Sequence, residues 1–256
     1  MAFFALEFPP ISHLVEWPAF LFDGTPFAVN KITLIYLAAA ICSLSIFIIG
    51  GSKKALVPTG VQNVAEASVD FIRNGVVLQT IGPDGMRFMP FLCSLFFFIF
   101  FTNITGIIPV VQMPANARMA MPAFFALLTW VLFIAVGIKY QGPFGYLKSV
   151  LFPPGVPKAL YLLVTPIEFI STFLVRPFSL AVRLFANLLA GHILLVTFGV
   201  LAAALWAAKP TVAIVPLPFL MLVFLTGFEV LVAFLQAYIF TILAAVYIGG
   251  AMHPEH

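Results

Sequence analysis

A short polar stretch inside a long apolar run contains residues suited to proton chemistry. Residues 183–192 read RLFANLLAGH and lie within an apolar run from 160 to 208 that has few acidic or basic residues. A charged side chain in hydrocarbon is costly unless it is paired or hydrated, so Arg183 marks a candidate functional site. His192 changes protonation near neutral pH and is therefore suited to relaying protons.

Helical spacing separates these polar residues into two groups. Ser179 and Asn187 lie four residues before and four residues after Arg183, so the three share one helix face. His192 lies nine residues after Arg183, which places it about half a turn round the helix and about 13 Å along the axis. Arg183 and His192 are therefore expected to point in opposite directions.

The last apolar run, 211–252, supplies a second set of polar residues. Glu229 is the one acidic or basic residue in that run, and Gln236 follows it by seven positions on the same helix face. Tyr247 lies eleven residues beyond Gln236, close to that face. We therefore expect this helix to turn one polar side toward the stretch that contains Arg183.

Two interpretations of these residues remain open on physical grounds. In the first, two oblique helices line two separate water pathways, Arg183 is a fixed cation between them, and His192 and Glu229 relay protons. In the second, Glu229 or Glu168 neutralises Arg183, and the polar residues only hold the helices together.

The composition indicates an all-α integral membrane protein. The 256 residues are 63% hydrophobic and only 8% charged, against about 25% charged residues in soluble domains. Apolar runs of about 20 residues or more favour spanning helices over barrel strands. The net charge is +3, and the basic residues form no stripe along the sequence, which argues against nucleic-acid binding. The sequence contains no Walker loop, GxGxxG or HExxH motif, and Cys42 and Cys93 lie in apolar segments away from any Cys/His cluster, so neither a cofactor nor a metal site is expected.

We expect one membrane domain, 1–256, with about five membrane-embedded helices and one amphipathic helix at the membrane surface. Residues 160–208 would form a helix of roughly 70 Å against a hydrocarbon core of about 30 Å. Either two spans meet near Arg176 and Pro177, or one long helix runs obliquely. The expected segments are an acidic external arm at 1–28, a first span at 30–49, an interfacial helix at 60–80, a helical hairpin at 88–138 with spans at 88–111 and 123–138, and a long tilted hairpin at 160–252.

The distribution of basic residues predicts the orientation in the membrane. Lys and Arg gather in the segments after the first and third spans, and cytoplasmic loops are enriched in these residues. The external N-terminus and cytoplasmic C-terminus follow from this, in a cell inner membrane. Residues 1–10 lack the basic region of a signal peptide. The basic residues that predict this orientation are Lys53, Lys54, Arg73 and Arg87 after the first span, and Lys139, Lys148 and Lys158 after the third.

Several motifs together resemble those of subunit a of the F-type ATP synthase. The run RPFSLAVRLFANLLAGH at 176–192 is followed by LQAYIF at 235–240 and then by Tyr247. TPIE at 165–168 and NITGIIP at 103–109 also fit. The resemblance extends from about residue 58 to the end of the chain.

The resemblance implies a stator subunit that provides two offset proton half-channels to a ring of c subunits and couples proton flow to rotation and ATP synthesis. The chain itself would not be catalytic. The implied partners are the c-ring, b-type peripheral stalk subunits, the remaining ATP synthase subunits and membrane lipid. Long tilted helices against the ring are implied for 160–252.

The resemblance also assigns residues. The essential arginine of the family corresponds to Arg183, its asparagine to Asn187 and its glutamine to Gln236. The best-known bacterial members have an acidic residue at the position of His192 and a histidine at that of Glu229, so this pair is exchanged.

The inner, exit side of the pathway is assigned in the same way. Glu168 corresponds to the acidic residue of the family on that side, and Ser179 lies near the same pathway. A self-contained secondary transporter or channel, with Arg183 as counter-ion or gate, is the alternative. An inverted repeat would favour it, and the sequence has none that we can see.

Overall fold

The described part of the chain is helical, apart from turns and one isolated bridge between Leu21 and Val29. The computed structural model describes residues 19–21, 24, 28–52, 59–108, 115–152, 157, 160–207 and 213–252. Its elements are α2 (Lys31–Ser52), α3 (Val61–Ile72), the π-helical η1 (Arg73–Val77), α4 (Leu78–Thr80), the 3₁₀ turn η2 (Pro83–Phe88), α5 (Met89–Ile104), the 3₁₀ turn η3 (Ala115–Ala117), α6 (Ala120–Gln141), α7 (Pro143–Leu151), α8 (Tyr161–Ile170), the π-helical η5 (Ser171–Val175), α9 (Arg176–Ala207) and α10 (Pro216–Met252).

Five helices in the described residues are long and apolar enough to cross a membrane. They are Lys31–Ser52, Pro83–Ile104, Ala120–Gln141, Tyr161–Trp206 and Pro216–Met252. The prediction of an all-α membrane protein with about five such helices is confirmed. Most of the predicted arm at 1–28 lies outside the described residues, as do Lys53, Lys54 and Lys158.

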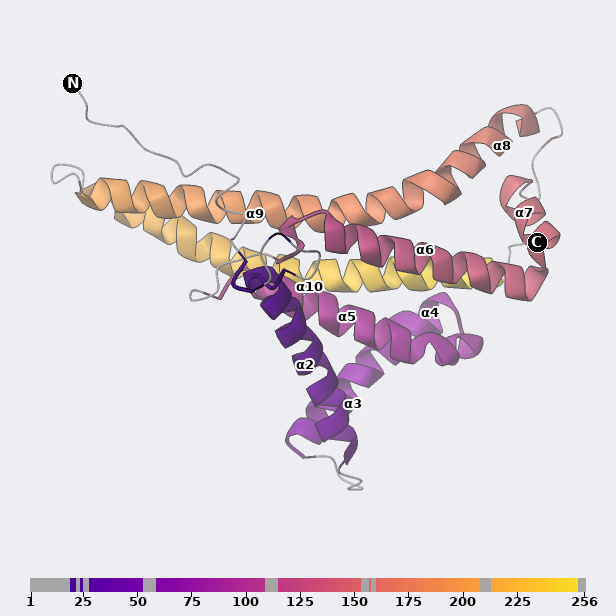
Figure 1. Ribbon diagram of the computed structural model, residues 1–256, viewed down its shortest axis with the longest axis horizontal. Helices are drawn as coiled ribbons and strands as arrows, with labels where there is room; N and C mark the ends of the chain where they lie inside the picture. The colour runs from indigo at the N-terminus through magenta and orange to yellow at the C-terminus, as the bar shows by residue number, and fades with distance from the viewer. Residues whose placement is uncertain are drawn as a thin grey trace.

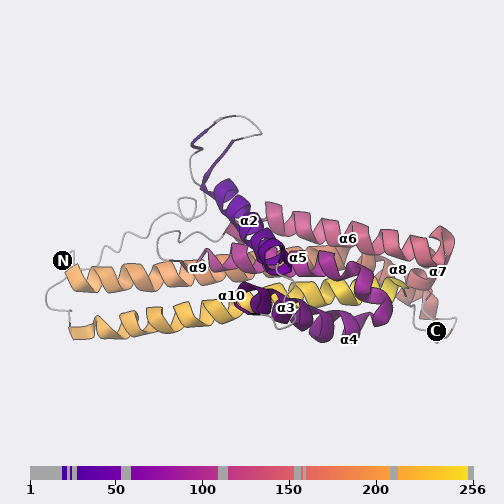
Figure 2. The same cartoon turned by 90° about the horizontal axis from the view of Figure 1, so that it is seen from below.

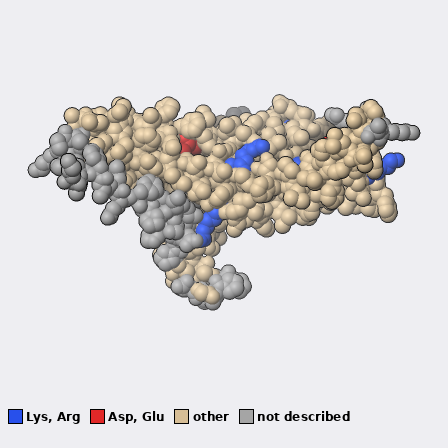
Figure 3. Space-filling model, turned by 90° about the horizontal axis from the view of Figure 1, so that it is seen from above, with Lys and Arg blue, Asp and Glu red and all other residues tan. Residues whose placement is uncertain are grey.

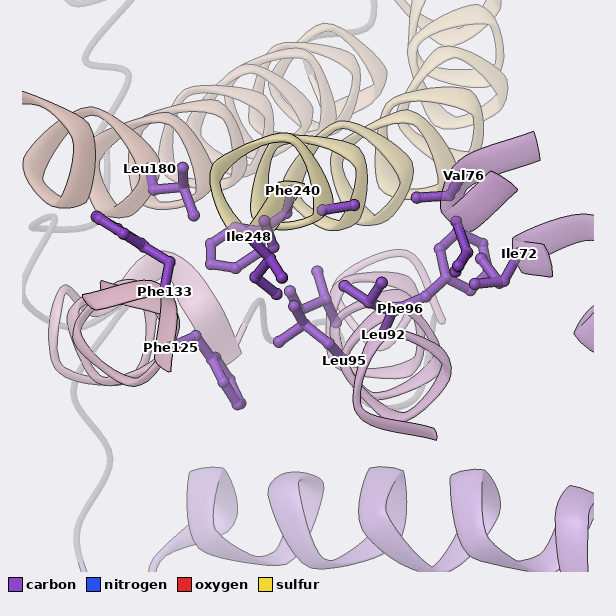
Figure 4. Close-up of a cluster of buried hydrophobic side chains, with 14 of the residues drawn as sticks. Ile72, Val76, Leu92, Leu95, Phe96, Phe125, Phe133, Leu180, Phe240 and Ile248 are labelled. Atoms are coloured by element: carbon purple, nitrogen blue, oxygen red, sulfur yellow. The ribbon is translucent and has the colours of Figure 1, made fainter. Parts of the chain in front are cut away.

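Helix α10 occupies the centre of the bundle. It packs against α5, α6 and α9, and side chains from these helices meet around it (Figure 4). Helices α5 and α6 run in opposite directions (Figure 1), but the main contacts of each are with the long helices. The rings of Phe98 and Phe125, 5.2 Å apart, link α5 and α6 directly. The two helices of the predicted hairpin at 88–138 are thus held together largely by their contacts with α10.

The segment from Tyr161 to Trp206 is one continuous helix. It bends through Pro166 and the π-helical turn η5, and it continues without a loop through Arg176 (Figure 1). Of the two interpretations of this run, the single long helix is therefore the correct one. With its 37 residues, α10 measures about 55 Å, and a helix of that length remains in a hydrocarbon core of about 30 Å only if it is strongly tilted.

The far ends of α9 and α10 lie side by side and project beyond the other helices (Figure 2). Their outer side chains are large and apolar, among them Trp206 at 69% exposure and Leu217 at 71%. The face seen from above in Figure 1 is almost wholly uncharged, with a few separate charged groups (Figure 3). Surfaces of this kind suit lipid or another apolar protein surface.

The predicted amphipathic helix at 60–80 is formed by α3, η1 and α4. It is anchored at both ends, because Ala65 contacts Gly50 of α2 and Val76 is fully buried in the core. Its position at the membrane surface stays a prediction. The second span ends at Ile104, earlier than the predicted 111, because the backbone turns at Gly106, whose N–H donates to the Asn103 carbonyl at 3.2 Å.

The opposite end of the bundle is closed by contacts around α7. Gly142 has a φ of 75°, which breaks the helix between α6 and α7. Gln141 Nε2 donates to the Ala251 carbonyl at 2.8 Å and so ties α6 to the end of α10. Tyr146 packs on Gly137, and burial raises the pKa of its phenol although the nearby Arg176 charge opposes the shift.

Candidate functional site

The Arg183 side of α9 is open in the isolated chain. Arg183 and Asn187 are exposed, and Ser179 is half-buried one turn before Arg183. Arg183 forms no ion pair or hydrogen bond with any residue that the structure describes. The interpretation in which Glu229 or Glu168 neutralises Arg183 is therefore not supported. A charged group on an uncovered apolar helix suits a partner that is outside this chain.

His192 lies on the other side of α9 and is 8% exposed. Helical periodicity explains the difference, because nine residues correspond to about two and a half turns. His192 faces the space between α9, α10 and the end of α5, where it lines two cavities. A titratable group is thus enclosed by the chain, whereas the fixed cation is presented to the outside.

Glu229 approaches α9 closely at a glycine. A Cβ atom added to Gly191 would collide with the Glu229 carboxylate. Because Gly191 has no side chain, α10 can bring Glu229 directly beside it, one residue before His192. This contact could not be predicted for Gly191, since its effect depends on which residue of α10 faces it.

Three cavities follow one another along the α9–α10 interface. The first, about 410 Å³, is lined by His192, Gly199 and Thr226 among others. The second, about 20 Å³, brings together His192, Glu229, Asn187 and Asn103. The third, about 320 Å³, adds Gln236 and also contains Asn187 and Glu229. The three adjoin one another through shared lining residues, and polar side chains lie among mainly apolar ones from His192 to the exposed face of α9.

Gln236 is 5% exposed and contributes to the third cavity from α10. The structure thus brings together four of the predicted site residues: Asn187, His192, Glu229 and Gln236. Arg183 lies one helical turn from Asn187 on the same face of α9.

The remaining predicted residues lie elsewhere along the long helices. Glu168 is half-buried on α8, fifteen residues before Arg183 and therefore about 22 Å away along the helix. Tyr247 packs near the end of α10, where its ring lies 5.7 Å from Phe133 and 5.2 Å from the Arg176 guanidinium. Neither lines the three cavities described above.

The structure adds Asn103, at the end of α5, to the residues of the site. Asn103 is fully buried and lines the second cavity together with Gly106. The sequence contains a signal for it, since it is an amide at the end of a Phe-rich span, but it was predicted only as part of the motif NITGIIP and not as a site residue. Among the residues that the structure describes, no group of three His, Cys, Asp or Glu could hold a metal ion.

Comparison with known proteins assigns the family. Residues 32–249 match the family model of the ATP synthase A chain. This chain belongs to the ATP synthase subunit a family. It is 44% identical to ATP synthase subunit a of Frankia alni over 89% of this chain and 79% of the relative. With that of Rhodococcus erythropolis the identity is 42% over 93% and 88%, and with that of Nocardioides sp. it is 39% over 97% and 94%.

Membership in the subunit a family confirms the resemblance drawn from the motifs. Together with the five candidate spans, it identifies the chain as a multi-pass membrane protein that takes part in proton transport and ATP synthesis. Its partners are other ATP synthase subunits.

Proposed function

We propose that this subunit a is the stator component that provides two offset proton half-channels to a ring of c subunits. The observation that carries the proposal is the separation of two kinds of site on α9. His192 is buried and lines a cavity together with Glu229 and Asn103, whereas Arg183 is exposed and has no ion pair among the residues that the structure describes. A proton route is expected to lie inside the subunit, whereas a fixed charge that acts on a rotating partner is expected to lie on its surface.

In the proposed entry path, a proton passes from the external side to the ring carboxylate by way of the cavities. It moves past His192 and Glu229, which can each take up and release it, and then past Asn187 to the open face of α9. The external side is assigned from the distribution of Lys and Arg in the sequence. Gln236 supplies an amide to the last cavity on this path.

In the proposed exit path, the ring carboxylate gives up its proton near Ser179 and Glu168 on the inner side. Arg183 stands between the two paths and attracts the bare carboxylate as it passes. At about 4 Å and an effective dielectric constant of about 20, this attraction is roughly 4 kcal/mol. Each proton that crosses the membrane releases about 2.3 kcal/mol per 100 mV, which is of comparable size, so the attraction to Arg183 need not stall rotation.

The partners proposed for the open face and the periphery are the c-ring and b-type stalk subunits. Exposed apolar side chains on the same helix, among them Phe178 and Leu194, suit a second apolar helix surface, and a carboxylate on that surface would neutralise the Arg183 charge. The proposed orientation has the N-terminus outside and the C-terminus in the cytoplasm. The long tilted hairpin at 160–252 is the part of the single membrane domain that faces the ring.

Gentle purification and reconstitution test the proposal together. A tagged chain extracted in mild detergent should co-purify with an oligomeric ring of small hairpin subunits and with the ATP-synthesising subunits. Liposomes containing the whole complex should make ATP when a proton gradient is applied. If the chain alone transports a solute and no ring accompanies it from the membrane, the transporter alternative would replace the stator proposal. Family membership favours the stator.

A further inference from the structure

A buried network of polar side chains connects the first helix to the second cavity. Tyr36 on α2 donates its hydroxyl to the Ala115 carbonyl at 2.8 Å and lies 3.4 Å from Asn116 Oδ1. Asn116 Nδ2 donates to Thr102 Oγ1 and to Asn103 Oδ1, both at 2.8 Å. Thr102, Asn103 and Asn116 are each fully buried. The network therefore joins α2, η3 and α5 just behind the cavity shared with His192 and Glu229.

The hydrogen bonds give each amide a direction. The one hydrogen of the Thr102 hydroxyl is shared between the backbone carbonyls of Phe98 and Ile99, so its oxygen accepts from Asn116. The Tyr36 hydroxyl donates its hydrogen to the Ala115 carbonyl at 2.8 Å, and its contact with Asn116 Oδ1 at 3.4 Å is the weaker one. The nitrogen of Asn116 therefore lies on the α5 side, where it meets the oxygen of Asn103.

Asn103 is then left with one unpaired group, its amide nitrogen. Asn103 Nδ2 has no hydrogen-bond partner among the described residues, although the side chain is fully buried. If the amide of Asn103 turned over, its N–H groups would face those of Asn116, and such a contact is repulsive. A buried amide N–H without a partner is costly and calls for an acceptor such as water.

The second cavity offers that acceptor. Asn103 lines it together with His192 and Glu229, and its volume is about 20 Å³. One water molecule needs roughly 10–15 Å³ on the same measure, and two to four polar partners. A water held there would accept from Asn103 and remain within the same enclosure as both titratable groups.

We propose that Asn116 is a positioning residue for proton entry, because it holds the Asn103 amide with its N–H group directed at a water shared with His192 and Glu229. This inference rests on the proposed function of the cavities as an entry path. Asn116 itself touches neither titratable residue. It acts through Asn103, and it would also make α2 part of the support for the path.

A double-mutant cycle in the whole ATP synthase tests the assignment. Asn116→Ala, Asn103→Ala and the double variant are reconstituted in liposomes, and ATP synthesis driven by an imposed proton gradient is measured per assembled complex. We expect each single change to lower the rate about tenfold, as for loss of one buried hydrogen bond. The double variant should be no slower than Asn103→Ala, because Asn116 acts through Asn103.

Asn116→Asp separates positioning from packing. The carboxylate keeps the shape of the side chain but cannot donate, so the Asn103 amide must turn and present its oxygen to the cavity. We expect a loss at least as large as that of Asn116→Ala. A buried carboxylate is also costly in itself, so the rate is taken per assembled complex, and the loss should disappear in the Asn103→Ala background if Asn116 acts through Asn103. Asn74→Ala, at an exposed position of η1, is the matched control and should keep the parental rate.

Thr102→Val covers the case in which the Asn116 variants fail to assemble. It keeps the volume of the side chain, removes the acceptor that orients Asn116, and should lower the rate two- to threefold, by about half of a net hydrogen bond. That loss should disappear in the Asn103→Ala background. A parental rate in Asn116→Asp, or additive losses in either cycle, would overturn the inference. Failure of the proposed function itself is distinguishable, because Arg183→Ala would then leave synthesis intact.

Discussion

Polar residues at the two ends of the long α9–α10 pair have different surroundings. On the side of His192 and Glu229, helices from three parts of the chain surround connected cavities. On the side of Arg176, the guanidinium lies over the Tyr247 ring at 5.2 Å, and Glu168 is half-buried on a helix that extends away from the centre (Figure 1).

In the proposed route, this difference suggests that the chain contributes unequally to the two halves. The His192 half is lined by this chain on several sides. The half that contains Ser179 and Glu168 lies along a helix with an uncovered face, so its enclosure would come from the neighbouring subunit. Arg183 belongs to neither half, because it faces outward between them.

The largest expected effect comes from removing the charge between the two halves. Arg183→Ala should abolish proton-driven ATP synthesis, because an attraction of roughly 4 kcal/mol corresponds to about a thousandfold in rate. Measurement in inverted membrane vesicles, with the amount of assembled complex determined by immunoblot, checks this. Arg183→Lys keeps the charge without the planar guanidinium and should restore little. Normal synthesis in Arg183→Ala would remove Arg183 from the coupling step.

The next effect tests whether the enclosed half acts as a unit. His192→Glu and Glu229→His should each lower synthesis, because each leaves two groups of the same kind around a cavity of about 20 Å³. The exchange of both residues restores one of each and should hurt less than either single change. The three variants are compared at equal expression. Equal or greater damage in the exchange would contradict a functional pair.

A smaller effect is expected from filling the gap beside Glu229. Gly191→Ala places a methyl group against the carboxylate, and overpacking of this kind costs about 1–3 kcal/mol. Synthesis should fall about fivefold at the lower end of that range. Glu229→Asp withdraws the carboxylate by one methylene and should recover part of the rate in the double variant. Gly227→Ala on α10, where an added Cβ meets nothing within 4 Å and which lines none of the three cavities, is the matched control.

Much of this arrangement could be predicted from helical periodicity alone. Nine residues of spacing within one helix predict that Arg183 and His192 point in opposite directions, whereas the structure shows that His192 is the buried one. The single long helix through Arg176 did not follow, because its length allowed either a tight turn or a tilt. The π-helical turn η5 and Pro166 bend the helix so that no loop is needed.

Contacts between helices were harder to predict, since they depend on which elements become neighbours. Nothing in the sequence around Asn116 indicates that a residue in the connection after α5 folds back onto Asn103. The central position of α10 between α5 and α6 was likewise absent from the apolar pattern, because α10 is apolar on nearly all sides. Periodicity predicted the helix face on which Tyr247 lies. Only the structure shows that its neighbours are Arg176 and Phe133.

The smallest expected effect concerns Tyr247, and it decides whether the Arg176 end carries protons or only holds the helices. Tyr247→Phe keeps the aromatic face over Arg176 and the contact with Phe133, so synthesis and thermal stability of the complex should change little. Tyr247→Leu removes the cation–π contact, worth about 0.5–1 kcal/mol where it is accessible to water, and should lower the thermal stability slightly. If Tyr247→Phe instead slowed synthesis as much as Tyr247→Leu, the hydroxyl would belong to the exit path, and the two ends of the α9–α10 pair would differ less than their packing indicates.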